Sequence, residues 1–422
     1  MNIDTEKAIA GLFGSGRLVE LLAVLNGDGE ETRVVGGAVR NALLQLPTGD
    51  VDLATTAVPE TVIARTLAAS FKPVPTGIEH GTVTVVVRGR PFEVTTLRKD
   101  IATDGRHATV RFGRDFDEDA RRRDFTVNAL SVSVDRALHD PVGGLPDLKA
   151  GRIRFIGEAA ERIREDYLRI LRFFRFHAAY GEGPLDRAGR DAAIAEREGL
   201  GVLSAERIRA EIMKFMVTPR AGEIAQEISD TGFFERIFGG IAYPVLFARL
   251  AQIERTAGDA VLRLGALAVA VREDADRLRT RLRLSNAEYK RLVEMADARV
   301  VWRNRDCVPD ERDLRAQLFL AGRGAASDAL ALAHAASGAP PNDPDWLAAA
   351  EFLAEAQEPR LPLTGEDVMA GGVRGKLVGA ALKSLQARWI RAGFPKEPGI
   401  VARLLDEVLS ELPSASRART PP

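Results

Sequence analysis

The strand signals of this chain almost vanish after about residue 158, and that change limits the folds available to it. Before this point, short runs rich in β-branched residues alternate with amphipathic stretches. From there to about residue 410, apolar residues recur at helical spacing, interrupted by turns that contain Gly and Pro. We therefore expect an α+β fold, with an N-terminal α/β domain of about 150 residues followed by an all-helical remainder.

Length, charge and cysteine content exclude several classes of protein. With 422 residues the chain is too long for one core, so several domains are expected. Lys and Arg total 59 against 60 Asp and Glu, so only local clusters of charge could indicate a nucleic-acid partner. The single cysteine, Cys307, excludes a disulfide framework and a cysteine zinc site, and no apolar run has the length of a signal peptide or membrane span. We expect a cytoplasmic protein without a membrane partner.

The N-terminal part predicts alternating strands and helices. Residues 1–30 predict a helix, and the following residues predict a strand at 31–35, a helix at 38–46, a strand at 50–56 and a hairpin at 82–97. Residues 98–120 are polar and aperiodic, which favours a long mobile loop, and such loops are usually functional. A further strand is expected at 124–134 and a turn-rich connector at 140–151.

Three acidic residues lie in apolar frames typical of strands. Asp50 and Asp52 alternate with Val51 and Leu53, and residues two apart on a strand point to the same face. Glu93 stands between two apolar residues in the second strand of the hairpin, so it would join the pair if the two strands were neighbours. Converging carboxylates suit Mg²⁺ and the activation of a hydroxyl towards a phosphate. Alone, an Asp-x-Asp motif is more often a solvated strand end.

Two adjacent glycines precede the aspartates by the length of a helix. Gly36 and Gly37 would let backbone N–H groups approach phosphate oxygens, and the helix starting near Ala38 would present its positive end. Arg40, in the first turn of that helix, could reach the same phosphates. A Gly-Gly pair by itself is usually a turn, but the joint spacing indicates a site for a triphosphate and its metal ions.

Several motifs occur in one order along the chain and resemble a known family. They are VVGGAVRN with DVDLATT, a later Phe-Glu-Val, RRRDFTVNAL, DPVGGLPDLKAGRIRFIG and EDYLRILRFFRF. Together they resemble the polymerase-β-type nucleotidyltransferases, and among these the bacterial class II tRNA nucleotidyltransferases (CCA-adding enzymes) and their poly(A) polymerase relatives. The similarity is dense over roughly residues 30–215 and returns at LTGEDVMAGGVRGKLVGAALKSL near the C-terminus.

The resemblance implies an elongated chain of four parts. Residues 1–150 would form the nucleotidyltransferase head, residues 151–218 a helical neck for base selection, and residues 219–335 a helical body that binds tRNA. Residues 336–422 would form a helical tail that ends in a disordered segment, SASRARTPP.

The resemblance also implies roles for individual residues. Asp50 and Asp52 would be the catalytic ligands of Mg²⁺, with Glu93 as a third catalytic carboxylate. The nucleotide would be bound by residues of three motifs: Gly36, Gly37, Arg40, Arg123, Asp124, Asn128, Asp166, Arg169, Arg172 and Arg175. Asp124 is expected near the ribose 2′-hydroxyl. Asn41 departs from the acidic residue usual in the family, and no role is assigned to it.

The motif EDYLRILRFFRF contains an acid and a base that could select the nucleotide. Cytosine and adenine both present an exocyclic amine donor beside a ring-nitrogen acceptor, whereas guanine and uracil present a carbonyl beside a ring N–H. Asp166 accepting from the amine and Arg169 donating to the ring nitrogen would therefore favour C and A. On one helix, Asp166 and Arg169 are neighbours, but Arg175 lies about 180° away from Asp166. The alternative is that Glu165 and Arg169 form an ordinary surface ion pair.

The expected activity is addition of C, C and A to the tRNA 3′ end from CTP and ATP, with release of pyrophosphate. Residues 149–175 hold eight Lys and Arg against four Asp and Glu, a local excess that suits an RNA acceptor end. The alternatives are a poly(A) polymerase, an enzyme that adds only A, and an inactive RNA-binding protein. The sequence favours no particular oligomeric state.

Overall fold

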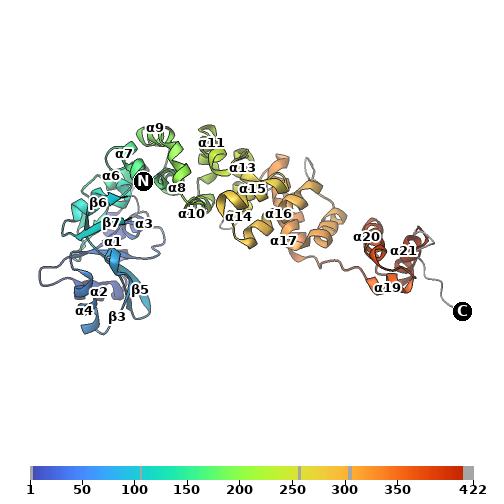
Figure 1. Ribbon diagram of the computed structural model, residues 1–422, viewed down its shortest axis with the longest axis horizontal. Coiled ribbons are helices and arrows are strands. Elements are labelled where there is room, and N and C mark those ends of the chain that lie inside the picture. The colour runs from blue at the N-terminus through green and yellow to red at the C-terminus, as the bar shows by residue number, and fades with distance from the viewer. Residues whose placement is uncertain (1–2, 105–106, 255–257, 303–306, 412–422) are drawn as a thin grey trace. The chain divides into compact units, whose positions relative to one another are not determined.

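The structure, a computed structural model, describes residues 3–104, 107–254, 258–302 and 307–411. Of residues 80, 99–104 and 107–111 only the backbone is described. The chain separates into two compact units, Met1–Phe233 and Phe234–Pro422. Every strand of the described residues belongs to the first unit, and the elements described in the second are helices (Figure 1). The predicted α+β fold, with an N-terminal sheet and a helical remainder, is confirmed.

Seven strands of the first unit form one mixed sheet in the order β3-β4-β5-β2-β1-β8-β9. They are β1 (Thr32–Val35), β2 (Asp52–Thr55), β3 (Lys72–Gly77), β4 (Thr82–Val87), β5 (Arg90–Thr96), β8 (Ser131–Val132) and β9 (Leu138–His139). Strands β2 and β5 are parallel and set Asp52 opposite Glu93, while β1 and β2 are antiparallel. The predicted strand at 31–35 and the predicted hairpin are confirmed, and the strand predicted at 50–56 is present over residues 52–55, without Asp50.

Helices α2 (Gly16–Leu25) and α4 (Pro59–Ala68) pack on one face of this sheet (Figure 1). Alternate residues of β4 and β5 are buried, as expected for strands with one covered face. Glu93 alternates with the buried Phe92 and Val94, so it projects from the opposite face. The predicted single helix over residues 1–30 is instead two helices, α1 (Thr5–Leu12) and α2, with Ser15 as the N-cap of the second. Helix α3 (Gly37–Leu43) follows β1.

The segment between residues 98 and 151 is more ordered than the sequence predicts. In place of the predicted loop, β6 (Arg98–Asp104) and β7 (His107–Phe112) pair as a separate two-stranded sheet, followed by α5 (Phe116–Arg121). The predicted strand over 124–134 is wrong for its first half, which contains a 3-10 turn, Thr126–Asn128, ahead of β8. The connector contains a short helix, α6 (Gly144–Lys149).

The first unit ends in helices that carry an aromatic cluster. These elements are α7 (Ala159–Glu165), α8 (Leu168–Tyr180), α9 (Arg187–Ala195), the 3-10 helix η3 (Arg197–Val202), α10 (Ala205–Met216) and α11 (Ala221–Asp230). The ring of Phe125 lies 4.9 Å from Phe155 and 5.2 Å from Phe176 of α8, between ring centroids, and Phe155 stacks on Phe173 at 5.4 Å. These buried rings attach α8 to the segment around residue 125.

The second unit is built of helices that pack around buried apolar residues. Its helices are α12 (Phe233–Phe238), α13 (Pro244–Ile253), α14 (Ala260–Ala268), α15 (Arg272–Leu282), α16 (Asn286–Trp302), α17 (Glu311–Ser337, interrupted at Gly322), α18 (Pro344–Glu355), α19 (Gly365–Ala370), α20 (Lys376–Arg391) and α21 (Pro398–Glu411). One core surrounds Trp302, Leu318 and Trp346, and another surrounds Leu385 and Val408. The absence of strand signals after residue 158 is thus confirmed for the described part of this unit.

The predicted division into parts ending at residues 150, 218 and 335 stays a prediction. The predicted disordered segment at the C-terminus lies outside the described residues. No single helix that the structure describes is long and apolar enough to cross a membrane. Only α1 and α2 taken together satisfy those two criteria, and that pair is bent by 84°.

Asp147 of α6 fixes the connector, and its removal should destabilise the first unit. The side chain is 1% exposed and accepts hydrogen bonds from Thr126 Oγ1 at 2.7 Å, Arg152 Nε at 2.8 Å and Arg154 Nε at 3.0 Å. Asp147→Ala should cost about 2–3 kcal/mol of unfolding free energy because it leaves the buried Thr126 hydroxyl without an acceptor and removes the carboxylate that Arg152 and Arg154 share. Scanning calorimetry should show a melting temperature roughly 5–10 °C lower for the first unit.

A matched control is Glu60→Ala, which removes an exposed acid from the first turn of α4. This variant should melt within about 2 °C of the unmodified chain. Equal melting temperatures for Asp147→Ala and Glu60→Ala would contradict the anchoring role of Asp147.

Candidate active site

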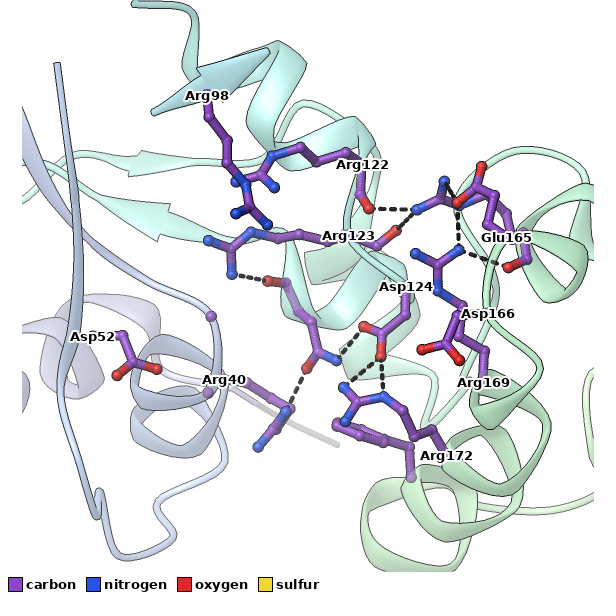
Figure 2. A pocket seen from close by; sticks show the side chains of 15 residues that line it. Arg40, Asp52, Arg98, Arg122, Arg123, Asp124, Glu165, Asp166, Arg169 and Arg172 are labelled. Carbon is purple, nitrogen blue, oxygen red and sulfur yellow. Dashed lines mark hydrogen bonds and ion pairs between the residues drawn. The ribbon is translucent and has the colours of Figure 1, made fainter. Parts of the chain in front are cut away.

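One pocket of the first unit collects most of the predicted site residues. It has a volume of about 950 Å³ and is open to solvent at the meeting point of α3, the segment 122–128 and α8 (Figure 2). Ten of the thirteen predicted residues line it: Gly36, Gly37, Arg40, Asp52, Arg123, Asp124, Asn128, Asp166, Arg169 and Arg172. Asp50, Glu93 and Arg175 are not among the lining residues. The pocket therefore joins motifs that are more than a hundred residues apart in the sequence.

The carboxylates lie where the parallel pair of strands begins. Asp52 is the first residue of β2 and stands opposite Glu93 of β5, and neighbouring strands are about 4.8 Å apart. Asp50 precedes β2, so the argument that places Asp50 and Asp52 on one face of a strand does not hold. Within the residues that the structure describes, no three His, Cys, Asp or Glu side chains are grouped closely enough to hold a metal ion.

The environment of Asp52 disfavours its ionised form. The surrounding protein raises the pKa of Asp52, mainly by displacing water, next through the charge of Glu93, and to a smaller extent through that of Asp50. The charge of Arg123 opposes these effects but does not cancel them. Because the oxygens are hard ligands under mutual repulsion, a divalent cation bound beside Asp52 would relieve an unfavourable interaction.

Gly36 forms the turn between β1 and α3 and leaves no room for a side chain. Its φ of +68° belongs to the left-handed region, and a Cβ atom there would lie 2.8 Å from a terminal nitrogen of Arg123. Gly37 begins α3, as predicted to within one residue. The tight approach of Arg123 brings a guanidinium against the same turn, where a phosphate would bind.

Arg40 is buried and has neutral partners among the residues around it. It is 6% exposed, and its guanidinium donates to Oδ1 of Asn128, to Oδ1 of Asn41 at 2.9 Å and to the hydroxyl of Tyr180 at 2.9 Å. It also lies 4.0 Å from the centroid of the Tyr180 ring. Burial lowers the pKa of Arg40 from its ordinary value. Asn41, to which the sequence assigned no role, orients this arginine.

A chain of hydrogen bonds runs from α3 to α8 across the floor of the pocket. Asn128 accepts from Arg40 and donates through Nδ2 to Asp124 Oδ1 at 2.9 Å. The second oxygen of Asp124 accepts from Arg172 Nε at 2.7 Å (Figure 2). Burial raises the pKa of Asp124, but the charge of Arg172, followed by the hydrogen bonds from Asn128 and Arg172 and from the Phe125 amide, lowers it overall.

Asp166 and Arg169 both line the pocket, but they do not lie on one helix as predicted. Helix α7 ends at Glu165, α8 begins at Leu168, and Asp166 has extended backbone angles between them. Its carboxylate accepts from the Leu168 amide at 3.1 Å and from Arg207 of α10 at 2.7 Å. Arg169 donates to Glu165 at 2.5 Å and to the Arg162 carbonyl at 2.6 Å. The Glu165–Arg169 ion pair, which was the alternative to base contact, is present, and Asp166 and Arg169, the pair predicted to contact the base, each have another partner.

Arg175 lies on α8, directed towards α10 and outside the pocket lining. Its Nε donates to Glu211 at 2.6 Å, and its guanidinium lies 4.5 Å from the centroid of the Phe176 ring. Arg40 and Arg172 each lie 5.2 Å from the same ring. Phe176 is therefore surrounded by three cations whose charge its π-electrons partly balance.

Five lining residues are missing from the set that the sequence predicts, namely Arg98, Arg122, Arg162, Glu165 and Phe176. Arg122 and Arg123 share the buried carboxylate of Asp119, and Arg162 donates to Glu165 and to the carbonyl of Arg123. Arg122 and Glu165 adjoin predicted residues in their motifs, so adjacency could have suggested them. Arg98 falls in the segment predicted as a loop, and no local pattern distinguishes it.

Comparison with known proteins identifies the family. Residues 32–154 match the family model described as the poly A polymerase head domain. The chain is 33% identical over 416 residues to CCA tRNA nucleotidyltransferase 1, mitochondrial, of Mus musculus, covering 93% of this chain and 88% of the relative. It is 31% identical over 412 residues to the CCA-adding enzyme of Limosilactobacillus fermentum, covering 92% and 96%.

A solved structure agrees with these relatives. The Bacillus stearothermophilus CCA-adding enzyme in complex with CTP superimposes with a TM-score of 0.71 and 28% sequence identity, over 93% of this chain and 96% of that one. The polymerase-β-like head followed by helices is thereby confirmed. Identity at this level over nearly the whole length, together with the shared fold and the pocket, means that this chain belongs to the family of CCA-adding enzymes, which are tRNA nucleotidyltransferases.

Proposed function

We propose that this chain adds C, C and A to the 3′ end of tRNA from CTP and ATP without a nucleic-acid template, releasing pyrophosphate. One observation carries the proposal: a single pocket contains the glycine turn, Asp52 and the base-contacting pair. A nucleotide bound there would have its phosphates near Gly36 and its base near α8. The names of the relatives and the CTP complex of the Bacillus stearothermophilus enzyme support this assignment.

The carboxylates at the point where the pairing of β2 with β5 begins are proposed to hold Mg²⁺. Asp52 would be the principal ligand, with Asp50 beside it, and Glu93 is the third candidate because it stands in register with Asp52. Their oxygen donors fit a hard cation, and the raised pKa of Asp52 supports the proposal, because a bound cation would favour the ionised carboxylate. When bound, the metal would favour ionisation of the attacking hydroxyl and stabilise charge on the leaving pyrophosphate.

The phosphates and ribose are assigned to the turn and the segment that follows α5. Gly36 and Gly37 allow close backbone approach, and Arg40 and Arg123 provide positive charge at the same turn. Asp124 and Asn128 are joined by a hydrogen bond and both line the pocket, so they are placed to orient the ribose. Arg172, which is bonded to Asp124, would be the nucleotide contact from α8. Arg175 acts on this set through Glu211 rather than from the pocket wall.

Base selection is assigned to Asp166 and Arg169. Asp166 is paired with Arg207, and Arg169 is paired with Glu165. An incoming base must therefore replace these partners. Cytosine and adenine can do so, because each offers a donor to the carboxylate and an acceptor to the guanidinium. Guanine and uracil would leave both groups unpaired, which is the usual basis of strong discrimination by hydrogen bonding.

The remaining features of the proposal concern partners and location. We assign the tRNA acceptor arm to the helices after residue 218, which would bind it by shape and backbone contacts. We keep the cytoplasm as the expected compartment, since the one cysteine is exposed and unpaired. The oligomeric state forms no part of the proposal.

Stepwise incorporation tests the proposed activity directly. tRNAs lacking three, two or one of their terminal nucleotides are incubated separately with CTP or ATP and Mg²⁺. The first two should accept only C and the last only A, because the same pocket selects each nucleotide in turn. ATP incorporation on the last substrate alone would indicate an A-only enzyme, long A tracts a poly(A) polymerase, and no incorporation at all an inactive RNA-binding protein.

Asp52→Asn should separate catalysis from stability. Because the folded chain raises the pKa of Asp52, the ionised group destabilises the fold at neutral pH, and a neutral amide removes that cost. Nucleotide incorporation should fall on the order of a thousandfold, while the melting temperature at pH 7 without metal should stay equal or rise. The difference in melting temperature should vanish as the pH falls below the pKa of the unfolded carboxyl, where both side chains are neutral.

Asp28→Asn is the control for this variant, since its side chain is 94% exposed on the same unit. It should change neither activity nor melting temperature appreciably. A lower melting temperature for Asp52→Asn, in proportion to its activity loss, would contradict a role as metal ligand.

Asp166→Asn should weaken base selection without unfolding α8, because an amide oxygen can still accept from the Leu168 amide. Incorporation of CTP should fall roughly 10- to 100-fold, as the oxygen no longer carries charge and the amide nitrogen repels the base amine. The ratio of CTP to UTP incorporation, measured in competition, should fall with it.

Asp186→Asn provides the matched control for Asp166→Asn. Asp186 caps α9 in the same way, accepting from the Gly189 amide at 3.0 Å, and does not line the pocket. Its replacement should leave the CTP to UTP ratio unchanged. An unchanged ratio in Asp166→Asn as well would remove Asp166 from base selection.

A further inference from the structure

Arg98 differs from the other arginines of the pocket in its partners. It begins β6, lines the pocket and is partly buried. Its Nε, like that of Arg162, is inaccessible to solvent and makes no hydrogen bond to any residue that the structure describes, but the terminal nitrogens of Arg162 are paired with Glu165 and the Arg123 carbonyl. A buried guanidinium nitrogen without an acceptor is unfavourable in the folded chain unless a ligand supplies one.

Every other arginine that lines the pocket has an acceptor among the described residues. Arg122 and Arg123 share Asp119, Arg172 is bonded to Asp124, and Arg40 has two asparagines and a tyrosine. Arg162 and Arg169 share Glu165. Arg98 is therefore the lining arginine whose donors remain available in the part of the chain that the structure describes.

The pocket has more positive than negative side chains, and Arg98 is the arginine whose charge is not balanced by a described residue. Seven arginines line the described pocket against four carboxylates, and Asp119 lies behind Arg122 and Arg123. Arg98 lies at the upper left of the pocket in Figure 2, whereas Asp166 and Arg169 lie at its right. The unbalanced charge thus lies away from the base-contacting pair, where an anionic part of the ligand would be placed.

The backbone fixes Arg98 to the catalytic sheet. A single residue, Leu97, separates it from β5, the strand that sets Glu93 opposite Asp52. The Leu97 amide donates to the Thr55 carbonyl of β2 at 2.8 Å, and the Leu97 carbonyl accepts from Gly113 at 2.7 Å. Because β2 carries Asp52, the position of Arg98 is tied to that of the proposed metal ligand.

We propose that Arg98 binds the terminal phosphates of the incoming nucleotide and holds the pyrophosphate as it leaves. In the transfer, the tRNA 3′ hydroxyl oxygen bonds to the α-phosphorus and loses its proton to solvent. The bond from the α-phosphorus to the bridging oxygen breaks, and that oxygen keeps the electron pair as part of pyrophosphate. Arg98 forms no covalent bond; its planar donors pair with phosphate oxygens whose charge increases in this step.

The assignment rests on the proposed function and is tested by binding, without tRNA or turnover. The dissociation constants of CTP and CMP are measured in Mg²⁺ for the full chain and for Arg98→Gln. The variant should bind CTP about tenfold more weakly, as expected for loss of a charge-assisted hydrogen bond, and CMP within about twofold of the unmodified chain. Arg98→Lys should recover part of the loss, since it keeps the charge but not the planar fork.

Arg88→Gln is the matched control, as Arg88 lies in the β4–β5 turn with 69% of its side chain exposed. It should bind both ligands as the unmodified chain does. Equal weakening of CTP and CMP in Arg98→Gln, or no weakening of either, would overturn the assignment. If the unmodified chain failed to incorporate C and A in order, the proposed activity would fall while the preference for CTP over CMP could still be measured.

Discussion

The buried carboxylate of Asp124 is the interaction on which the pocket depends. It is 8% exposed and joins the segment that follows it to α8, because it accepts from the Phe125 amide and Asn128 on one side and from Arg172 on the other. The pKa of Asp124 is held below its ordinary value, because its partners outweigh the effect of burial. Its contribution to stability is therefore present at neutral pH and is lost only as the pH falls through the pKa of the folded carboxyl.

This single acid sets the distance between the two halves of the site. Through Asn128 it reaches Arg40 on α3, which follows the glycine turn, and through Arg172 it reaches α8, which adjoins the base-contacting pair. The aromatic rings of Phe125, Phe155 and Phe176 pack beneath it and keep α8 from moving independently. Burial of such rings contributes roughly 1.5–3 kcal/mol each. The hydrogen bonds of Asp124 are therefore accompanied by apolar packing of the same elements.

Asp166 and Arg169 have protein partners that a bound base would replace. Glu165 and Arg207 orient Arg169 and Asp166 before any nucleotide arrives. A base that offers the matching donor and acceptor replaces these interactions at little net cost, whereas a mismatched base must break them without replacement. Selectivity then comes from a difference between two sets of hydrogen bonds rather than from the shape of the pocket alone.

The sequence predicts those parts of the site that local spacing determines. Gly36 and Gly37, Asp52 on its strand, and Glu93 in the hairpin all follow from alternation and turn chemistry, and the structure has them in the expected elements. Asp166 was expected on the same helix as Arg169, within EDYLRILRFFRF. The chain breaks there because Asp166 accepts from the Leu168 amide and from Arg207, and the second contact joins residues 41 apart.

Other differences have the same origin. The strands β6 and β7 pair only with each other, so their polar residues give no sign of a buried face. Helix α6 is held by the contacts of Asp147 with Thr126, Arg152 and Arg154. Its own sequence has no helical periodicity from which it could be predicted. Arg98 belongs to this less predictable segment, and only the pocket shows its relation to the site.

The central claim is that one pocket holds the triphosphate and selects the base without any nucleic acid. Titration of the full chain in Mg²⁺ with analogues of CTP, ATP, UTP and GTP that cannot react tests it most directly. The CTP and ATP analogues should bind more tightly than the UTP and GTP analogues, with dissociation constants lower by about tenfold or more. Equal affinity for all four in the absence of RNA would contradict it.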